Sequence, residues 1–135
     1  MRDTKFRGKQ ICTGEWLFGD LHHLKDGRYA IMTFCAGEQG DTLAMNEVIP
    51  ETVGEFTGLY DKNRKEIYEG DISEWPINEK GEKTRAFVAY KLGAFMYQCI
   101  DKNIKPIPCL IINENMVEVI GNIHDKPELL EATNE

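Results

Sequence analysis

The chain has no long run of apolar residues. A membrane-spanning helix needs about 18 consecutive apolar residues, and the N-terminal segment Met1–Arg7 has no apolar core of the kind found in signal peptides. We therefore expect a soluble protein that stays in the cytoplasm and has no membrane partner. Hydrophobic residues make up 41% of the chain and charged residues 29%, which is an ordinary balance for a folded domain rather than a disordered segment.

Sequence motifs of common catalytic and nucleotide-binding sites are also missing. Ser73 is the only serine, and it lies in a predicted strand without the Gly-x-Ser-x-Gly pattern that surrounds many serine nucleophiles. Neither a Gly-x-x-x-x-Gly-Lys-Ser/Thr loop nor a Gly-x-Gly-x-x-Gly motif occurs, so the usual phosphate cradles are absent. We expect no cofactor and no catalytic residue of these classes.

The cysteines and histidines lack the paired spacing of a closed metal site. No Cys-x-x-Cys pair occurs, and we predict no metal site. A domain of this size does not need disulfides, and the cytoplasm is reducing, so the cysteines are predicted to be reduced core thiols. The residues are Cys12, Cys35, Cys99, Cys109, His22, His23 and His124.

Basic residues are fewer than acidic residues, 16 Lys and Arg against 23 Asp and Glu, and the formal net charge is −7. Repulsion between this charge and phosphate backbones disfavours nonspecific binding to nucleic acid. A local basic patch remains open at the N-terminal arm, where Arg2, Lys5, Arg7 and Lys9 are the candidate nucleic-acid contacts. The simpler interpretation of so short a run is a solvated edge.

Three carboxylates, Glu66, Glu69 and Asp71, lie close together in the sequence. On an extended strand Glu69 and Asp71 share a face and Glu66 points the opposite way. Two carboxylates can hold a cation such as Mg²⁺ or act as an acid/base pair. A hydrogen bond from Asp71 to its own turn would explain the same pattern without chemistry.

The remaining residues predict many short strands. Glycines and prolines separate apolar and aromatic runs that are too short for most helices. Asp26-Gly27 is typical of a tight hairpin turn, and residues 61–65 are predicted to form a five-residue hairpin loop. Gly121 indicates a bulge, and the segment from Asp125 predicts a short helix. The predicted strands are 14–21, 29–34, 43–49, 59–60, 66–69, 72–75, 84–90, 94–100, 104–112 and 116–124.

The aromatic residues are spread along these strands, and we expect them in the core. Such rings can instead form a stacking surface for single-stranded nucleic acid, as in other small barrels. The Gly70-Asp71 step before the apolar strand 72–75 is similar to a step found in SH3-like barrels.

Three blocks of sequence together span nearly the whole chain: 5–9 with 14–21, 50–59 with 65–72, and 118–123 with 127–130. These blocks closely resemble the YopX family. The resemblance implies a phage or prophage origin, and hence the cytoplasm of a bacterial host cell, together with a predominantly β fold with barrel-like parts, self-association and no established biochemical activity. One position departs from the family pattern: the connector usually reads Asp-Lys-Asn-Gly-Lys, and here Arg64 replaces the glycine. Either Asn63 adopts the left-handed conformation or the turn differs.

We therefore predict a mostly β protein with a small β-barrel-like fold, in which an SH3-like part is joined by additional strands and a short C-terminal helix. The chain is predicted to be a single domain, 1–135, and a division into subdomains of about 1–57 and 58–130 is left open. The function we predict is a non-enzymatic, self-associating module that binds a phage or host protein. The alternatives are a nucleic-acid-binding β-barrel and a metal-dependent enzyme using Glu69 and Asp71.

Overall fold

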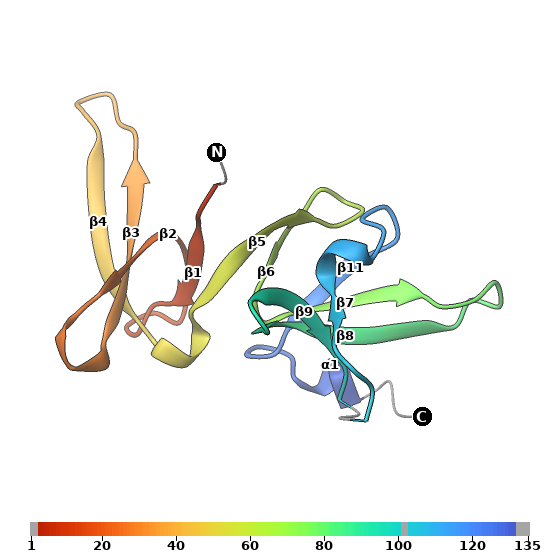
Figure 1. Cartoon of the computed structure of the whole chain (residues 1–135). Coiled ribbons are helices and arrows are strands. Elements are labelled where there is room, and N and C mark those ends of the chain that lie inside the picture. The colour runs from red at the N-terminus through yellow and green to blue at the C-terminus, as the bar shows by residue number, and fades with distance from the viewer. Residues whose placement is uncertain (1–2, 101–102, 132–135) are drawn as a thin grey trace. The chain divides into compact units, whose positions relative to one another are not determined.

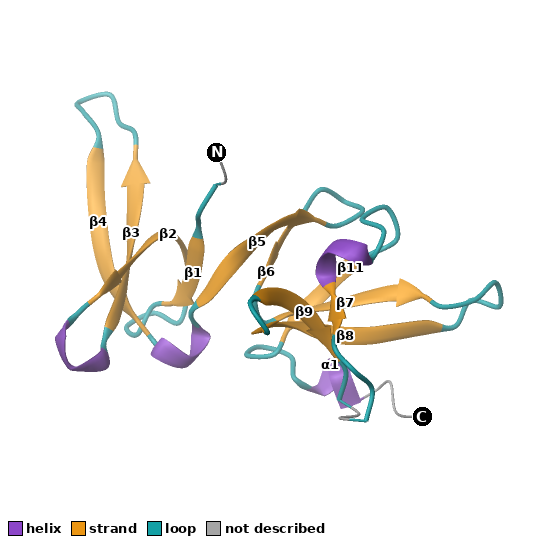
Figure 2. Cartoon of the chain, in the orientation of Figure 1, coloured by secondary structure: helices purple, strands orange, loops and turns teal. Residues whose placement is uncertain are grey.

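The computed structural model describes residues 3–100 and 103–131. It is a mostly β structure with a short helix near its C-terminal end (Figure 1, Figure 2). The predicted mostly β fold class is thus confirmed. Over these residues neither sheet closes into a complete barrel, so the term barrel-like describes the fold only loosely. The chain divides into two compact units, Met1–Phe56 and Thr57–Glu135. None of the helices in the described part of the chain has the length and apolar character that crossing a bilayer requires.

The first unit is a run of antiparallel strands in the order β4-β3-β2-β1-β5. Strand β5 begins in this unit, where Gly54 and Glu55 pair with β1, and its last residues belong to the second unit. The elements are β1 (Phe6–Lys9), β2 (Trp16–His23), η1 (Lys25–Gly27), β3 (Tyr29–Cys35), β4 (Thr42–Val48), η2 (Pro50–Thr52) and β5 (Gly54–Tyr60).

Strand β2 changes its partner at Gly19. Residues 16–19 pair with β1, and residues 20–23 pair with β3. A Cβ atom at Gly19 would collide with the backbone carbonyl oxygen of Met32. Only glycine therefore allows β3 to approach the backbone of β2 at this point.

A small core lies where the end of β4 meets the end of β1. Gln10 and Val48 form an isolated bridge, and the Ile49 N–H donates to the carbonyl oxygen of Lys9 at 2.8 Å. Val48 packs against Gly8, where an added Cβ would lie 3.0 Å from the Val48 side chain. With Ile31, Val48 is fully buried, so the absence of a side chain at position 8 makes this close packing possible.

The second unit contains a five-stranded antiparallel sheet in the order β10-β9-β8-β7-β11. One face of this sheet carries the buried core, to which Trp75, Val88 and Tyr97 contribute, together with Ile67 from the preceding hairpin. The elements are β6 (Glu66–Tyr68), β7 (Asp71–Pro76), β8 (Lys83–Lys91), β9 (Ala94–Gln98), β10 (Ile107–Pro108), η3 (Cys109–Ile111), β11 (Glu118–Asn122) and α1 (Glu128–Glu131).

The predicted strand 104–112 is wrong over most of its length. Only Ile107–Pro108 pairs with β9, and the chain then turns into the 3₁₀ segment η3. Pro106 and Pro108 lack the N–H groups that a strand interior must donate. The predicted bulge at Gly121 is confirmed, because the β11–β7 register shifts between Val119 and Gly121.

The two turns that the sequence analysis singled out use left-handed residues. Asp26 (φ 66°) and Gly27 (φ 76°) connect β2 to β3 as predicted. In the loop between β5 and β6, Arg64 itself takes the left-handed conformation, with φ 67°. Neither a left-handed Asn63 nor a glycine is needed, because the Asp61 side chain accepts the N–H groups of Asn63 and Lys65 and holds the turn.

Candidate functional site

The end of the β3–β4 hairpin extends beyond its neighbouring strand in the first unit (Figure 1). The β2–β3 pairing ends at Asp20–Met32, whereas the β3–β4 pairing continues to Cys35–Thr42. Within the described part of the chain, residues 33–35 and 42–44 therefore pair only with each other, and we call residues 33–44 the arm. A hairpin of two strands is marginally stable by itself in water, and the arm is anchored through the part of β3 that also pairs with β2.

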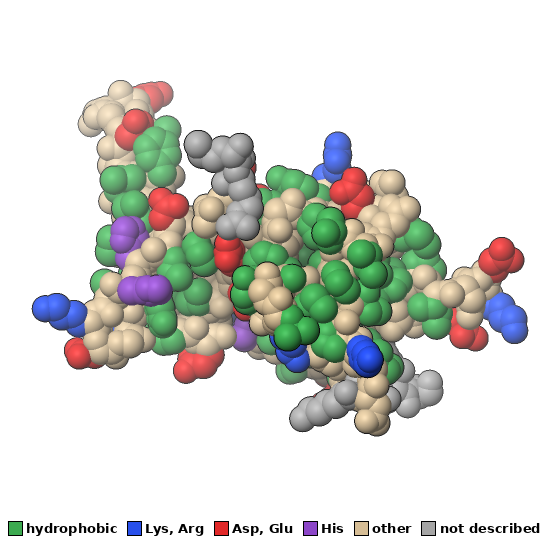
Figure 3. Space-filling view, in the orientation of Figure 1, with side chains coloured by type: hydrophobic (Ala, Val, Ile, Leu, Met, Phe, Trp, Pro, Cys, Tyr) green, Lys and Arg blue, Asp and Glu red, His purple; other side chains and the backbone are tan. Residues whose placement is uncertain are grey.

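One face of the arm is apolar and exposed. Phe34 and Leu43 are directly opposite each other across the hairpin, and their side chains are 62% and 66% exposed. Met32 and Met45 form the next pair on the same face. Phe18, on β2, lines a surface hollow together with Met32 and Phe34. Apolar side chains follow the hairpin toward its end in the space-filling view (Figure 3), so this face is a candidate contact surface.

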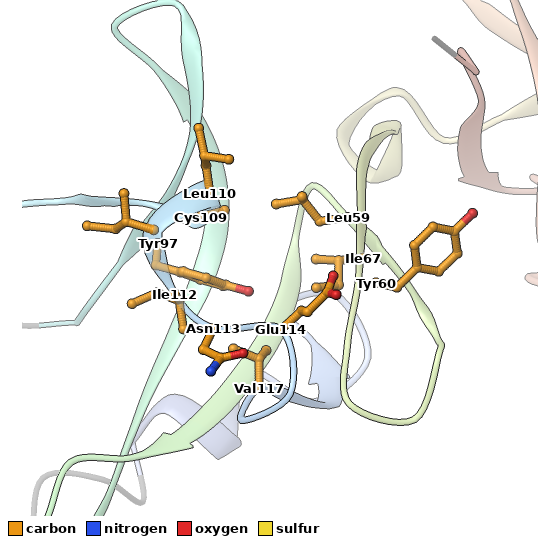
Figure 4. Close-up of a pocket in the computed structure, with 11 residues that line it drawn as sticks. Leu59, Tyr60, Ile67, Tyr97, Cys109, Leu110, Ile112, Asn113, Glu114 and Val117 are labelled. Carbon is orange, nitrogen blue, oxygen red and sulfur yellow. The ribbon is translucent and has the colours of Figure 1, made fainter.

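The second unit contains a cavity of about 300 Å³ with mostly apolar walls. Leu59 and Ile67 come from the β5–β6 hairpin, and Tyr97 from β9 points its hydroxyl toward them (Figure 4). The third wall is the segment 109–117, whose Leu110 and Ile111 are 78% and 67% exposed at the rim. The cavity is thus open to solvent and has an apolar rim.

Buried polar groups lie beside the cavity floor. Burial raises the pKa of the Tyr97 hydroxyl to about 12, and the carboxylates of Asp71 and Asp61 act in the same direction. The Ser73 hydroxyl opposes this rise more strongly than either carboxylate adds to it, although the Ser73 oxygen has no hydrogen-bond partner of standard geometry. Burial also raises the pKa of the Cys109 thiol to about 12. Neither group ionises at neutral pH, so neither is an activated nucleophile or base.

These two shifts predict a loss of stability in alkali. Both groups bind their proton more tightly in the folded protein than in the unfolded chain, whose thiol and phenol have pKa values of 9.0 and 10.0. The free energy of unfolding should therefore be unaffected by these groups below about pH 9 and should decrease toward pH 12. Urea unfolding midpoints at pH 8, 10 and 11 measure this. Cys109→Ala and Tyr97→Phe should each flatten the dependence, and unchanged slopes in both variants would contradict the prediction.

The candidate nucleic-acid residues lie against aromatic rings of their own unit. Arg2 is outside the described residues. The Lys5 ammonium lies 5.6 Å from the centre of the Phe56 ring, and Arg7 and Lys9 lie 4.7 Å and 5.7 Å from the Trp16 ring. Trp16 is half-buried. Cation–π contact of this kind stabilises a fold by about 0.5–2 kcal/mol, so these cations have a structural role in β1 and at the residue before it.

The carboxylate pair does not have the arrangement that the sequence analysis assumed. Glu69 lies in the turn Glu69-Gly70 rather than on a strand, so Glu69 and Asp71 do not share a strand face. Asp71 is buried and accepts the Tyr68 N–H at 2.7 Å, and Glu66 accepts the Tyr68 hydroxyl at 3.0 Å. The bond from Asp71 to its own turn is therefore present.

Metal-ligating and nucleophilic side chains do not cluster. No group of three or more His, Cys, Asp or Glu side chains that could hold a metal occurs among the described residues. The four cysteines are free, but only Cys109 is buried, while Cys12 and Cys35 are exposed. The prediction of core thiols is wrong for these two. Ser73 is fully buried in β7, where a substrate has no access.

Neither candidate surface is predicted from the sequence. The sequence pattern predicts Phe34 in the core, with Phe18 and Tyr90, and all three are exposed. The alternation Met32-x-Phe34 before the loop and Leu43-x-Met45 after it indicates one apolar hairpin face. Whether anything covers that face depends on residues distant in the sequence. The cavity combines three separate segments and has no sequence signature.

Comparison with known proteins agrees with the resemblance noted in the sequence. The YopX protein family matches residues 5–131. Protein EF1440 from Enterococcus faecalis is 25% identical, with a TM-score of 0.59, and the match covers 96% of this chain and 99% of that chain. Protein yopX from Bacillus subtilis is 17% identical, with a TM-score of 0.62 and the same coverage. No curated protein matches the chain. Because the family match extends over most of the sequence, this chain belongs to the YopX protein family.

Proposed function

We propose that this protein is a non-enzymatic module that associates with copies of itself through the arm. The observation that carries the proposal is the pairing of Phe34 with Leu43 on an exposed face. Burying a side chain of this size from water contributes about 1.5–3 kcal/mol. Covering the exposed apolar face of the arm with another protein would therefore favour association by about this amount for each side chain that becomes fully buried.

The edge of the arm supports the same proposal. Strand β4 is at the end of the strand order, and within the described residues its outer side is bridged only near Val48. An unpaired edge offers backbone donors and acceptors to another chain. A phage or host protein that binds this module would use the same apolar face and edge.

The other candidate functions have less support from the geometry. The cationic groups of Lys5, Arg7 and Lys9 lie against the rings of Phe56 and Trp16. This leaves fewer cations for a phosphate backbone. The carboxylate of Asp71 is buried in its turn, which makes a cation site with Glu69 less favourable than the strand arrangement would.

Self-association is tested by comparing the wild type with an arm variant, Phe34→Asp with Leu43→Asp. Light scattering after gel filtration should give a wild-type mass above the 15.5 kDa of one chain that rises with concentration. The arm variant should have the mass of one chain, because two carboxylates cannot be buried in an apolar contact. Leu92→Asp, at a leucine that is 93% exposed in the β8–β9 turn, is the matched control and should behave as the wild type. A monomeric wild type would contradict the proposal.

A further inference from the structure

The cavity is large enough to receive the apolar side chains of an arm from another copy. A cavity of about 150 Å³ is sufficient for a benzene ring, and the cavity in the second unit has about 300 Å³. This volume accommodates the Phe34 ring together with the Leu43 side chain. Leu110 and Ile111, exposed at the rim, extend the apolar surface outward, where they would cover the flanks of an inserted hairpin.

The charges are complementary as well. The loop at the end of the arm carries Glu38 and Asp41, and its sequence contains no basic residue. Beside the cavity, the turn 62–65 carries Lys62, Arg64 and Lys65, all exposed. This turn continues directly from Tyr60, which lines the cavity, and the Lys62 N–H donates to the carbonyl oxygen of Val117 on the same wall at 2.8 Å.

The charge pattern also gives the contact a direction. Lys62 is paired with Glu118 at 3.5 Å, so Arg64 and Lys65 supply the excess positive charge. Glu114 lines the cavity and would repel an acidic loop. An inserted arm therefore has its acidic loop on the side of the 62–65 turn.

We infer that the arm of one copy inserts Phe34 and Leu43 into the cavity of a second copy, with its acidic loop against the basic turn. This inference rests on the proposed self-association and specifies its partner surface. The contact joins two different surfaces, so each copy offers one arm and one cavity. Such head-to-tail contacts generate a ring when the rotation closes and an open chain when it does not.

A mixing experiment tests the contact. The arm variant, Phe34→Asp with Leu43→Asp, keeps an intact cavity. A cavity variant, Leu110→Asp with Ile111→Asp, keeps an intact arm and changes only exposed side chains. Each variant alone should self-associate at least about 30-fold more weakly than the wild type, as expected for the loss of one central apolar anchor. Circular dichroism and thermal melting of each variant verify that it is folded.

The equimolar mixture of the two variants should form a complex of two chains and no larger species. One intact arm then meets one intact cavity, and the remaining arm and cavity of the complex are both defective. If the arms instead pair with each other, the cavity variant will assemble with itself as the wild type does, and the mixture will contain no complex of one arm variant with one cavity variant. That result would overturn this inference and leave the proposed self-association standing. Leu92→Asp should change nothing in either experiment.

Charge reversal provides an independent test of the orientation. Arg64→Glu with Lys65→Glu should weaken association about 10-fold and reduce its salt dependence. The substitution replaces attraction between the acidic loop and the basic turn with repulsion. Adding Glu38→Lys and Asp41→Lys to the same chain should restore the affinity. Absence of rescue would contradict the placement of the acidic loop on the basic turn.

Discussion

Replacing Asp61 with alanine is expected to lower the free energy of unfolding of the second unit by about 3–5 kcal/mol. The buried Asp61 carboxylate accepts three backbone N–H groups. Asn63 and Lys65 donate to Oδ1 at 2.8 and 2.9 Å, and Val119 donates to Oδ2 at 3.0 Å. The third bond joins the β5–β6 loop to β11 across 58 positions of sequence. Alanine leaves the buried Val119 N–H without an acceptor, which costs about 1–3 kcal/mol, and it removes the two bonds that hold the turn.

Urea unfolding followed by Trp75 fluorescence measures this effect in the second unit. A Trp16→Phe background removes the signal of the first unit, because the chain has two tryptophans, one in each unit. Asp61→Asn should lose less than Asp61→Ala, since its remaining carbonyl oxygen can still accept the two N–H groups of the turn. Asp3→Ala, at an exposed aspartate, is the control and should lose under about 0.5 kcal/mol. Equal losses for Asp3→Ala and Asp61→Ala would show that the three bonds contribute nothing.

Gly19→Ala is expected to destabilise the first unit by about 2–3 kcal/mol. The added methyl group would collide with the Met32 carbonyl oxygen, and backbone atoms cannot rotate away as a side chain can. Either β2 and β3 separate at this point or the strand pairing shifts. Both outcomes should release the hydrogen bonds between β2 and β3, where the register pairs Asp20 with Met32 and Leu21 with Ile31.

Gly121→Ala is the matched control for this change. Its added Cβ would lie 2.8 Å from the Leu129 Cδ1 atom, the far end of a flexible side chain that can adopt another rotamer. Hydrogen exchange measured by mass spectrometry on peptides covering residues 16–35 should therefore show faster exchange in Gly19→Ala and wild-type exchange in Gly121→Ala. Slow exchange in Gly19→Ala would mean that the strands tolerate the added atom.

Local features of the fold follow from short stretches of sequence. Asp26-Gly27 forms a left-handed turn in almost any context because its residues tolerate positive φ. Asp61 accepts N–H groups two and four residues ahead, which is a local interaction that the residue type predicts. The strand 104–112 fails for a local reason too, since Pro106 and Pro108 remove donors and apolar content alone cannot compensate.

Contacts between distant residues decided the rest. The sequence by itself determined the mostly β architecture, the hairpin turns, the Gly121 bulge and the family, because these depend on residue types and spacings within one segment. Only the tertiary structure decided that Cys12 and Phe34 are exposed, that Asp61 binds the Val119 N–H and that Leu59, Tyr97 and Leu110 surround one cavity. Burial is a property of what packs on a residue, and the packing partners come from other parts of the chain.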